Sequence, residues 1–439
     1  MLKPDIEAPA ETPGQAAPPD RPGPVYRWYI LVVLMLVYTL NFLDRQIMGI
    51  LLEPIRKEFD LADWQLGVIV GVGFALIYCT LGLVAAAFTE NTNRARMIAL
   101  ALALWSAMTA ACGLAWSSLS LLAARFGVGL GEAGGSPASQ SLLSDIFPPE
   151  ERARALSIWG LGAPFGTALG VIGGAWIAHT YGWRTAFYAA GIPGIILALL
   201  IAFTVRDFRP FNRDLPKFSP ARVVALSWSI LSQPALLVAG IGVGIGTMVS
   251  YCSALWGPAY FIREFDLSPL SVSWFAAAVL GGATAVGTAL GGFLVHRFAP
   301  RWPSAYVDIP AIGYLLAAPC YWLALSIHDP VMSAAVLLVP TVLYSMSSGP
   351  IFALFQNLAP PGARAMATAV LFMMMNLIGL AIGPTLVGGL SSHFQAEYGL
   401  AGGLHRALLF VIAGLLPAAF ILFLSGRLSR TSAKRLQSE

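Results

Sequence analysis

The chain has 439 residues, of which 57% are hydrophobic and only 11% carry a charged side chain. This composition excludes an ordinary soluble domain and predicts a protein that crosses a bilayer many times. The net charge of +4 does not by itself indicate a nucleic-acid partner, and none is expected. The 44 Gly and 30 Pro residues are typical of membrane helices that pack closely, kink and break.

The first 24 residues are rich in Pro, Ala and Gly. They lack the apolar run that a signal peptide requires. We therefore expect residues 1–24 to form a disordered tail on the cytoplasmic side.

The first apolar run, residues 28–51, contains polar residues at Asn41, Asp44 and Arg45. A run of about 20 apolar residues matches the thickness of the hydrocarbon core, so it predicts a membrane-spanning helix. A charge near the bilayer centre costs about 2.5–3.5 kcal/mol on insertion scales, so such residues usually face a cavity or a partner. Two interpretations remain: a protonatable carboxylate beside a fixed positive charge, or a pair that neutralises itself or reaches the interface.

Further along the chain, Arg125 and Glu132 lie in the fourth apolar run, residues 119–146. They are seven residues apart, so two helical turns return them to nearly the same face. The glycines around them allow a neighbouring helix to approach closely. They form either a static salt bridge that locks the helix bundle or part of a proton-binding site.

The expected fold is all-α, a polytopic membrane protein with 12 transmembrane helices in two six-helix bundles. The bundles are expected at residues 25–205 and 233–427, with a cytoplasmic linker at 206–232 and a cytoplasmic tail at 428–439. The remaining predicted spans are residues 65–88, 97–116, 153–178, 184–205, 234–262, 271–296, 304–327, 331–356, 365–390 and 405–426.

The distribution of basic residues orients these spans. Of the 26 Lys and Arg residues, 19 fall on one side of the predicted membrane and 5 on the other. Because cytoplasmic loops carry the excess of Lys and Arg, both termini are expected in the cytoplasm and the protein in the plasma (inner) membrane.

The two halves repeat one another. Pro148-Pro149 precedes a glycine-rich span in the first half, and Pro360-Pro361 precedes one in the second. Two six-span halves related by internal repetition are typical of alternating-access carriers.

Spans seven to twelve contain almost no ionisable residue and offer neutral and aromatic groups instead, including Tyr251, Tyr344 and Asn376. An apolar half-cavity that faces a charged one suits an amphiphile, with its head group near Arg45 and Arg125 and its chain among Met and aromatic side chains. We therefore assign Asn41, Arg45, Arg125, Tyr251, Tyr344 and Asn376 as candidate substrate contacts. Ordinary helix packing is the alternative for the individual aromatic residues.

From about Tyr26 to Arg427 the sequence resembles the major facilitator superfamily. The residues 86–96 match the signature loop between spans two and three, with Ala86 in place of Gly and Glu90 in the acidic position. The resemblance implies a conformational latch formed by Glu90, Arg94, Arg96 and Arg154.

Within the superfamily, residues 41–46 (Asn-Phe-Leu-Asp-Arg-Gln), combined with Glu132, resemble the Spinster family. That family is linked to proton-coupled export of lysolipids, including sphingosine-1-phosphate. The resemblance implies that spans one and four line a central cavity. Asp44 and Glu132 would then carry the proton, because Arg does not titrate in proteins. Carriers of hexuronate and other organic anions share the Asp-Arg pair and are the alternative.

No span combines paired catalytic carboxylates with His, a metal-ligand set or a nucleotide-binding loop, so the chain is not expected to be an enzyme. The four Cys residues show no pairing or metal-ligand spacing. We expect a monomer without a cofactor or metal, whose partners are the bilayer, protons and an amphipathic or lipid substrate. A receptor built on a transporter scaffold is a further alternative.

Overall fold

The computed structural model describes residues 22–75, 77–78, 92–208, 220–359 and 364–438. These residues form helices and no strand, which confirms the all-α prediction. The helices of the first half are α1 (Pro24–Phe59), α2 (Asp63–Val70), α4 (Arg94–Gly113), α5 (Ser118–Ile146), α6 (Pro149–Gly160), α7 (Gly162–Ala168), the π-helical η1 (Leu169–Gly173), α8 (Gly174–Tyr181) and α9 (Trp183–Thr204).

The second half begins with a short helix in the linker and continues with long apolar helices. These are α10 (Pro220–Leu231), α11 (Pro234–Phe265), α12 (Pro269–Ala277), η2 (Ala278–Ala283), α13 (Thr284–Phe298), α14 (Ala305–Leu325), α15 (Pro330–Ser345), α16 (Ser348–Leu358), α17 (Arg364–Met374), η3 (Met375–Ile382), α18 (Gly383–Ala413) and α19 (Leu415–Ser438).

Short polar side chains define where several helices begin. Asn93, Ser268 and Asp329 each accept a hydrogen bond from a backbone N–H in the first turn of α4, α12 and α15. Such caps satisfy donors that have no partner within the helix. Gly399 has a φ of +71°, and this break inside α18 separates the last two predicted spans.

Nine helical segments within the described residues are long and apolar enough to cross a membrane. One of them, Met366–Leu428, contains the last two predicted spans on either side of Gly399. The fourth predicted span is the 29-residue helix α5, which carries Arg125 and Glu132. The second predicted span begins in α2 and continues into residues outside the described ranges.

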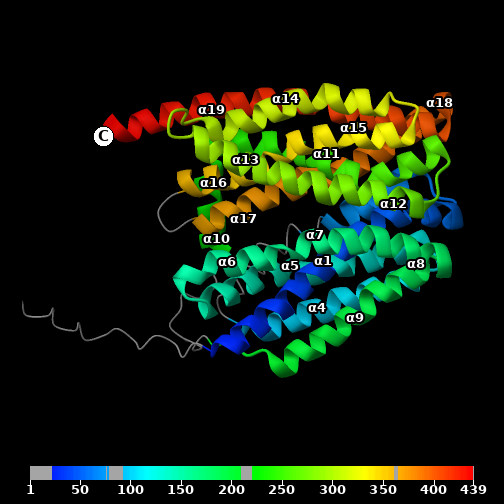
Figure 1. Cartoon of the computed structure of the whole chain (residues 1–439), viewed down its shortest axis with the longest axis horizontal. Helices are drawn as coiled ribbons and strands as arrows, with labels where there is room; N and C mark the ends of the chain where they lie inside the picture. Colours follow the sequence, from blue (N-terminus) through cyan, green and yellow to red (C-terminus); the bar gives the residue numbers. More distant parts are fainter. Residues whose placement is uncertain (1–21, 76, 79–91, 209–219, 360–363, 439) are drawn as a thin grey trace, which may run out of the picture.

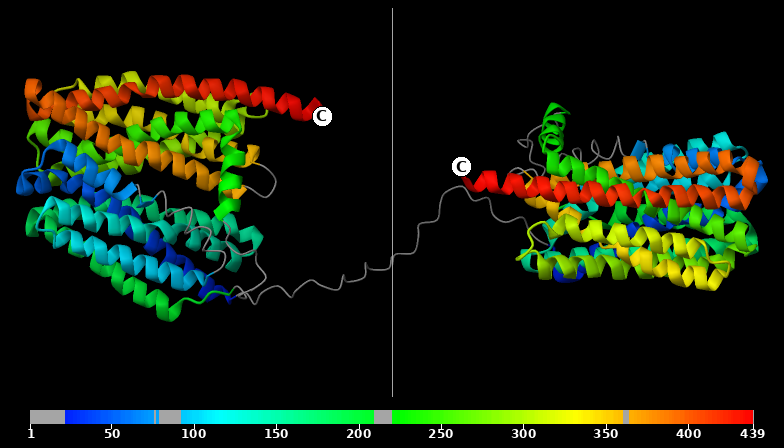
Figure 2. Two further views of the ribbon diagram at one scale, coloured as in Figure 1. Left: turned by 180° about the vertical axis from the view of Figure 1, so that it is seen from behind. Right: turned by 90° about the horizontal axis from the view of Figure 1, so that it is seen from above.

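The helices of each half pack mainly against one another. In the first half α4 packs on α5 and α9, and in the second α11 packs on α19 and η3. We call the end where α1 begins and α19 ends the terminal end, and the opposite end the distal end. The two groups of helices meet at the distal end and diverge toward the terminal end (Figures 1 and 2).

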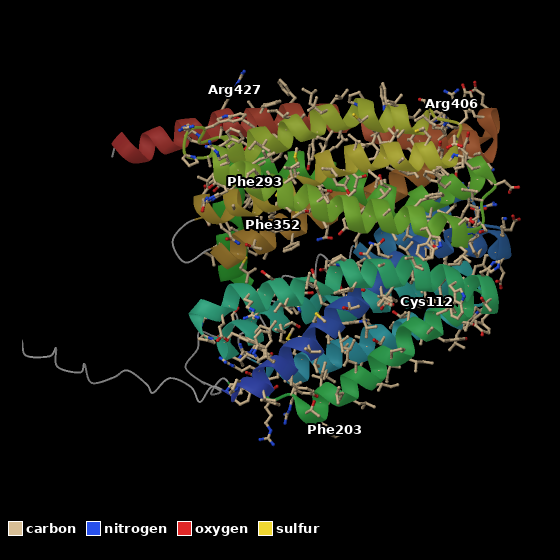
Figure 3. The ribbon with its side chains drawn as sticks, in the orientation of Figure 1. Cys112, Phe203, Phe293, Phe352, Arg406 and Arg427 are labelled. Carbon is tan, nitrogen blue, oxygen red and sulfur yellow. The ribbon has the colours of Figure 1, made fainter. Side chains whose placement is uncertain are left out.

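Large apolar side chains project from the outside of both halves, as a lipid environment requires. Phe203 and Phe293 are exposed on α9 and α13, whereas Cys112 is buried between helices (Figure 3). Arg427 and Arg406 lie toward opposite ends of the second half.

Glycines allow the two halves to touch. A Cβ atom on Gly49 of α1 would lie 2.7 Å from the carbonyl oxygen of Ala254 on α11. A Cβ atom on Gly67 of α2 would lie 2.6 Å from the carbonyl oxygen of Pro384 on α18. Both contacts involve backbone atoms, which cannot rotate away.

We therefore expect Gly49→Ala to destabilise this packing by about 1–3 kcal/mol, because overpacking forces the backbone to shift. The melting temperature of the purified protein in detergent measures the effect. Gly292→Ala on α13 is the matched control, because its added Cβ would meet nothing within 4 Å. Equal melting temperatures for the two variants would show that the close approach at Gly49 is not needed.

Candidate functional site

An ion pair joins α1 to α5 in the middle of the first half. The Nε and Nη2 atoms of Arg45 both lie 2.8 Å from Oε2 of Glu132. The Glu132 side chain is fully buried, and that of Arg45 is 16% exposed. Arg125, which the sequence analysis considered as a salt-bridge partner of Glu132, has no carboxylate partner within the part of the chain that the structure describes. Helical spacing places Arg125 and Glu132 on one face but cannot show which neighbouring helix supplies the guanidinium.

Asp44 lies beside this ion pair and is 3% exposed. Its Oδ2 accepts a hydrogen bond of 2.8 Å from the Thr109 hydroxyl on α4. Its Oδ1 is buried and has no hydrogen-bond partner among the described residues. The charges of Glu132, Arg125 and Arg45 are all close enough to act on the Asp44 carboxyl group.

Among the described residues, an aromatic ring and not a carboxylate lies against the Arg125 guanidinium. Its central carbon lies 5.1 Å from the centre of the Phe74 ring, and that of Arg45 lies 5.4 Å from the same ring. Arg45 also lies 4.7 Å from the centre of the Tyr78 ring. Cation–π contacts of this kind stabilise a buried guanidinium without neutralising it.

These residues form one buried cluster of two carboxylates and two guanidinium groups, which we call the acid–arginine cluster: Asp44, Arg45, Arg125 and Glu132. Asp44 Oδ1, Glu132 Oε1 and Arg125 Nε have no hydrogen-bond partner in the described ranges. Buried polar atoms without partners are costly. The two oxygens can accept a proton or a hydrogen bond, and the Arg125 nitrogen can donate one. The sequence predicted these four residues, but Thr109, a hydroxyl in an apolar helix, gave no signal.

Residues of the second half approach the cluster from the other side. The Tyr251 hydroxyl donates a 2.9 Å hydrogen bond to Oδ1 of Asn376, and the Asn376 amide donates to the Phe372 carbonyl oxygen at 2.8 Å. Tyr251 is close enough to Arg45 for an electrostatic interaction between them. Asn41 is buried on α1, one turn before Arg45.

Tyr344 lies in a different environment from Tyr251. Its hydroxyl is 3.0 Å from the Ser250 hydroxyl, and its ring centre is 6.2 Å from that of Tyr321. These neighbours all belong to the second half. Its assigned role as a substrate contact remains a prediction.

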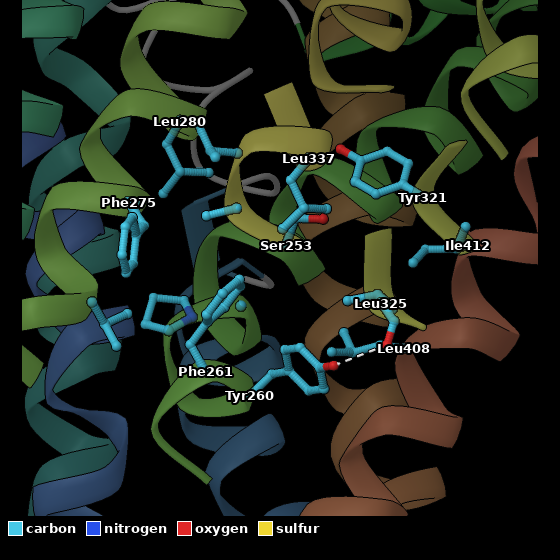
Figure 4. A pocket seen from close by; sticks show the side chains of 16 residues that line it. Ser253, Tyr260, Phe261, Phe275, Leu280, Tyr321, Leu325, Leu337, Leu408 and Ile412 are labelled. Carbon is cyan, nitrogen blue, oxygen red and sulfur yellow. Dashed lines mark hydrogen bonds between the residues drawn. The ribbon is translucent and has the colours of Figure 1, made fainter. Parts of the chain in front are cut away.

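An apolar cavity of about 60 Å³, partly open to its surroundings, lies within the second half (Figure 4). Side chains of α11, α12, α14, α15 and α18 line it, among them Phe261, Phe275, Leu337 and Leu408. The Tyr260 hydroxyl donates a hydrogen bond of 3.1 Å to the Leu325 carbonyl oxygen. Its proton is therefore not available to a ligand in the cavity.

Three of the predicted latch residues, Arg94, Arg96 and Arg154, lie at the terminal end. Arg94 is fully buried, and its guanidinium binds Asp145 at the end of α5 at 2.5 Å and Asp207 after α9 at 2.6 Å. Neither acidic partner was predicted; Asp145 belongs to the first half, and Asp207 lies in the segment assigned to the linker. Arg154 lies 5.4 Å from the centre of the Trp28 ring, and the Arg96 side chain is exposed. Glu90 lies outside the described residues.

The described residues contain no group of three or more His, Cys, Asp or Glu side chains that could hold a metal ion. The two carboxylates and two guanidinium groups of the acid–arginine cluster can bind protons and form ion pairs.

Comparisons with known proteins agree with this architecture. The sequence profile of the Major Facilitator Superfamily matches residues 34–384. An MFS-type efflux pump of Mycolicibacterium smegmatis is 31% identical over 399 residues, which cover 90% of this chain and 91% of the pump. Protein spinster homolog 1 of Xenopus tropicalis is 26% identical over 396 residues, or 85% of this chain and 75% of that protein.

The fold is also similar to a solved structure. The crystal structure of a bacterial homolog of the human lysosomal transporter Spinster, inward-facing and unoccupied, superposes with a TM-score of 0.83. The two chains are 28% identical, and the match covers 93% of this chain and 98% of that one.

Proposed function

The chain belongs to the major facilitator superfamily and is a Spinster-like transporter, and from this premise we propose that it is a proton-coupled carrier of an amphipathic lipid or lysolipid, similar to sphingosine-1-phosphate. It is a membrane transporter and not an enzyme. The observation that carries the coupling proposal is the acid–arginine cluster, with its buried carboxylates and unpartnered polar atoms.

In this proposal a proton and a guanidinium group compete for each buried carboxylate. Burial disfavours a charged carboxylate, whereas a nearby guanidinium favours it. In the present arrangement Arg45 holds Glu132, and among the described residues the Thr109 hydroxyl is the only direct hydrogen-bond partner of Asp44. Movement of α1 against α5 would change which carboxylate is paired, so that a proton binds in one conformation and leaves in the other.

The two sides of the proposed substrate path have different chemistry. The first half offers the guanidinium groups of Arg45 and Arg125, which suit an anionic head group. The second half offers the apolar cavity, where each buried methylene contributes about 0.8 kcal/mol. A ligand with both a charged head and a hydrocarbon chain would use both sides. The Tyr251–Asn376 pair would contact its polar part.

The orientation in the membrane follows from the basic residues. We propose that both termini lie in the cytoplasm and that the protein acts as a monomer in the inner membrane. The terminal end is then the inner side, and the divergence of the two halves there corresponds to an inward-facing conformation. The two halves, expected at 25–205 and 233–427, are the units that rock against each other.

Transport assays in proteoliposomes test the proposal. Sealed vesicles with an imposed pH gradient are offered a panel of lysolipids with charged and neutral head groups, and a parallel panel of hexuronates and other organic acids. Accumulation of a lysolipid that disappears when the pH gradient is abolished supports the proposal. If only organic acids accumulate, the protein is a carrier of small organic anions and not of lipids. If a compound binds but does not accumulate, the protein is a receptor.

The apolar cavity leads to a separate prediction about the length of the lysolipid's hydrocarbon chain. Ala334→Phe on α15 would fill part of the cavity, and we expect it to weaken binding of a long-chain lysolipid roughly tenfold or slightly more, because about two methylenes lose their burial. Binding is measured with a series of chain lengths. The neighbouring Ala335 is exposed, so Ala335→Phe is the control. A chain-length series that is identical for both variants would place the hydrocarbon chain elsewhere.

A further inference from the structure

Arg263 lies near the distal end of α11 and reaches across to the first half. Its Nε donates to Oε2 of Glu53 on α1 at 2.8 Å. Its Nη1 and Nη2 donate to the two carboxylate oxygens of Asp63, at the start of α2, at 2.7 and 2.8 Å. One guanidinium therefore binds two carboxylates from two elements of the other half. Bidentate pairs of this kind are strong and geometrically specific.

The network is buried although it lies near the end of the molecule. The Arg263, Glu53 and Asp63 side chains are 3%, 4% and 0% exposed. The Ser391 hydroxyl on α18 also donates to Asp63, at 2.6 Å. The network thus connects α1 and α2 of the first half to α11 and α18 of the second.

Arg56 makes a different contact in the same place. It donates to Oε1 of Glu53 from the same helix, at 2.7 and 2.9 Å. Its bonds stay within the first half, whereas those of Arg263 join the halves. Replacing Arg56 therefore removes a positive charge beside Glu53 without breaking a bond between the halves, whereas replacing Arg263 removes both the charge and the bonds between the halves.

At the terminal end the ion pairs are arranged differently. Arg94 binds Asp145 of the first half and Asp207 of the linker, and Arg27 binds Glu151 of the first half, so none of these pairs reaches the second half. The two halves therefore meet through buried charges at the distal end, where their helices converge (Figure 1).

We propose that Arg263, Glu53 and Asp63 form a gate that holds the distal end closed and must break before the transport path opens there. The proposal rests on the alternating-access function proposed above, but not on the identity of the substrate or of the coupling ion. Removing one partner of a buried ion pair leaves an uncompensated charge, which destabilises the closed arrangement. Opening the distal end would expose the separated groups to water and so lower the free-energy cost of the uncompensated charge.

Pulsed electron–electron double resonance tests the gate by measuring distances between two spin labels. The full-length protein is studied in lipid nanodiscs, without substrate and at one fixed pH. Spin labels are placed at Leu114→Cys, exposed where α4 ends, and at Ser326→Cys, exposed where α14 ends, after replacement of the native cysteines. We expect Arg263→Gln to raise the ratio of open to closed distal ends about tenfold or more. Arg56→Gln should leave the distance distribution close to that of the unchanged protein.

A charge exchange provides the second variant. Arg263→Asp combined with Asp63→Arg keeps a pair of opposite charges between the halves, and we expect it to restore much of the closed population. The proposal is overturned if Arg263→Gln leaves the distances unchanged, if Arg56→Gln opens the distal end equally, or if the exchange restores nothing. Because no substrate is present, these outcomes do not depend on whether lysolipids are transported.

Discussion

Asp44→Asn is expected to abolish proton-driven transport, reducing the gradient-dependent initial rate roughly tenfold or more, a size typical of coupling between two binding sites. Asn is nearly isosteric with Asp and can still accept the Thr109 hydrogen bond that the structure shows at 2.8 Å. It cannot bind and release a proton. The loss would therefore come from coupling and not from a collapsed helix packing.

Two assays on the same proteoliposomes separate these effects. Uptake driven by an imposed pH gradient requires the proton, whereas exchange of labelled for unlabelled substrate at equal pH requires only conformational change. We expect Asp44→Asn to lose the first and retain the second. Asp60→Asn is the control, because Asp60 is an exposed acid at the end of the same helix. Unchanged gradient-driven uptake in Asp44→Asn would show that another group carries the proton.

The acid–arginine cluster was predictable because charges inside apolar runs are expensive and so mark a function. Asp44, Arg45, Arg125 and Glu132 stand out for that reason alone. Their pairing was not predictable. Seven-residue spacing suggested Arg125 with Glu132, but Arg45 on another helix makes the ion pair. Contacts between helices depend on their rotation and offset, which periodicity does not determine.

The distal network was missed for a related reason. Arg263 follows the apolar part of the seventh predicted span, where a basic residue is usually a simple interfacial anchor. Its partners, Glu53 and Asp63, are 210 and 200 residues away in sequence. The all-helical membrane fold, in contrast, depends on the composition and length of each apolar run, which are local properties. The π-helical segments η1, η2 and η3 fall in or next to glycine-containing stretches but had no distinct pattern of their own.

Arg45→Lys is expected to weaken binding of an anionic lysolipid about 10- to 100-fold, or about 1.4–2.8 kcal/mol. The Arg45 guanidinium donates through two nitrogens to Glu132 and stacks near Tyr78 at the same time. A Lys ammonium keeps the charge but cannot reproduce that planar arrangement. Calorimetric titration at fixed pH measures the affinity, and Arg301→Lys, at an exposed arginine with no assigned role, is the control.

The comparison of Arg45→Lys with Arg45→Ala then separates geometry from charge. Ala leaves Glu132 buried without its ion-pair partner, so we expect a lower melting temperature as well as weaker binding. The Arg45→Lys variant should bind the lysolipid weakly, yet its melting temperature should be close to that of the unchanged protein. A lysolipid with a neutral head group should be affected little by Lys, because it places no anion against the cluster. If neutral and anionic lysolipids lose affinity equally, Arg45 supports the helix packing and does not contact the head group.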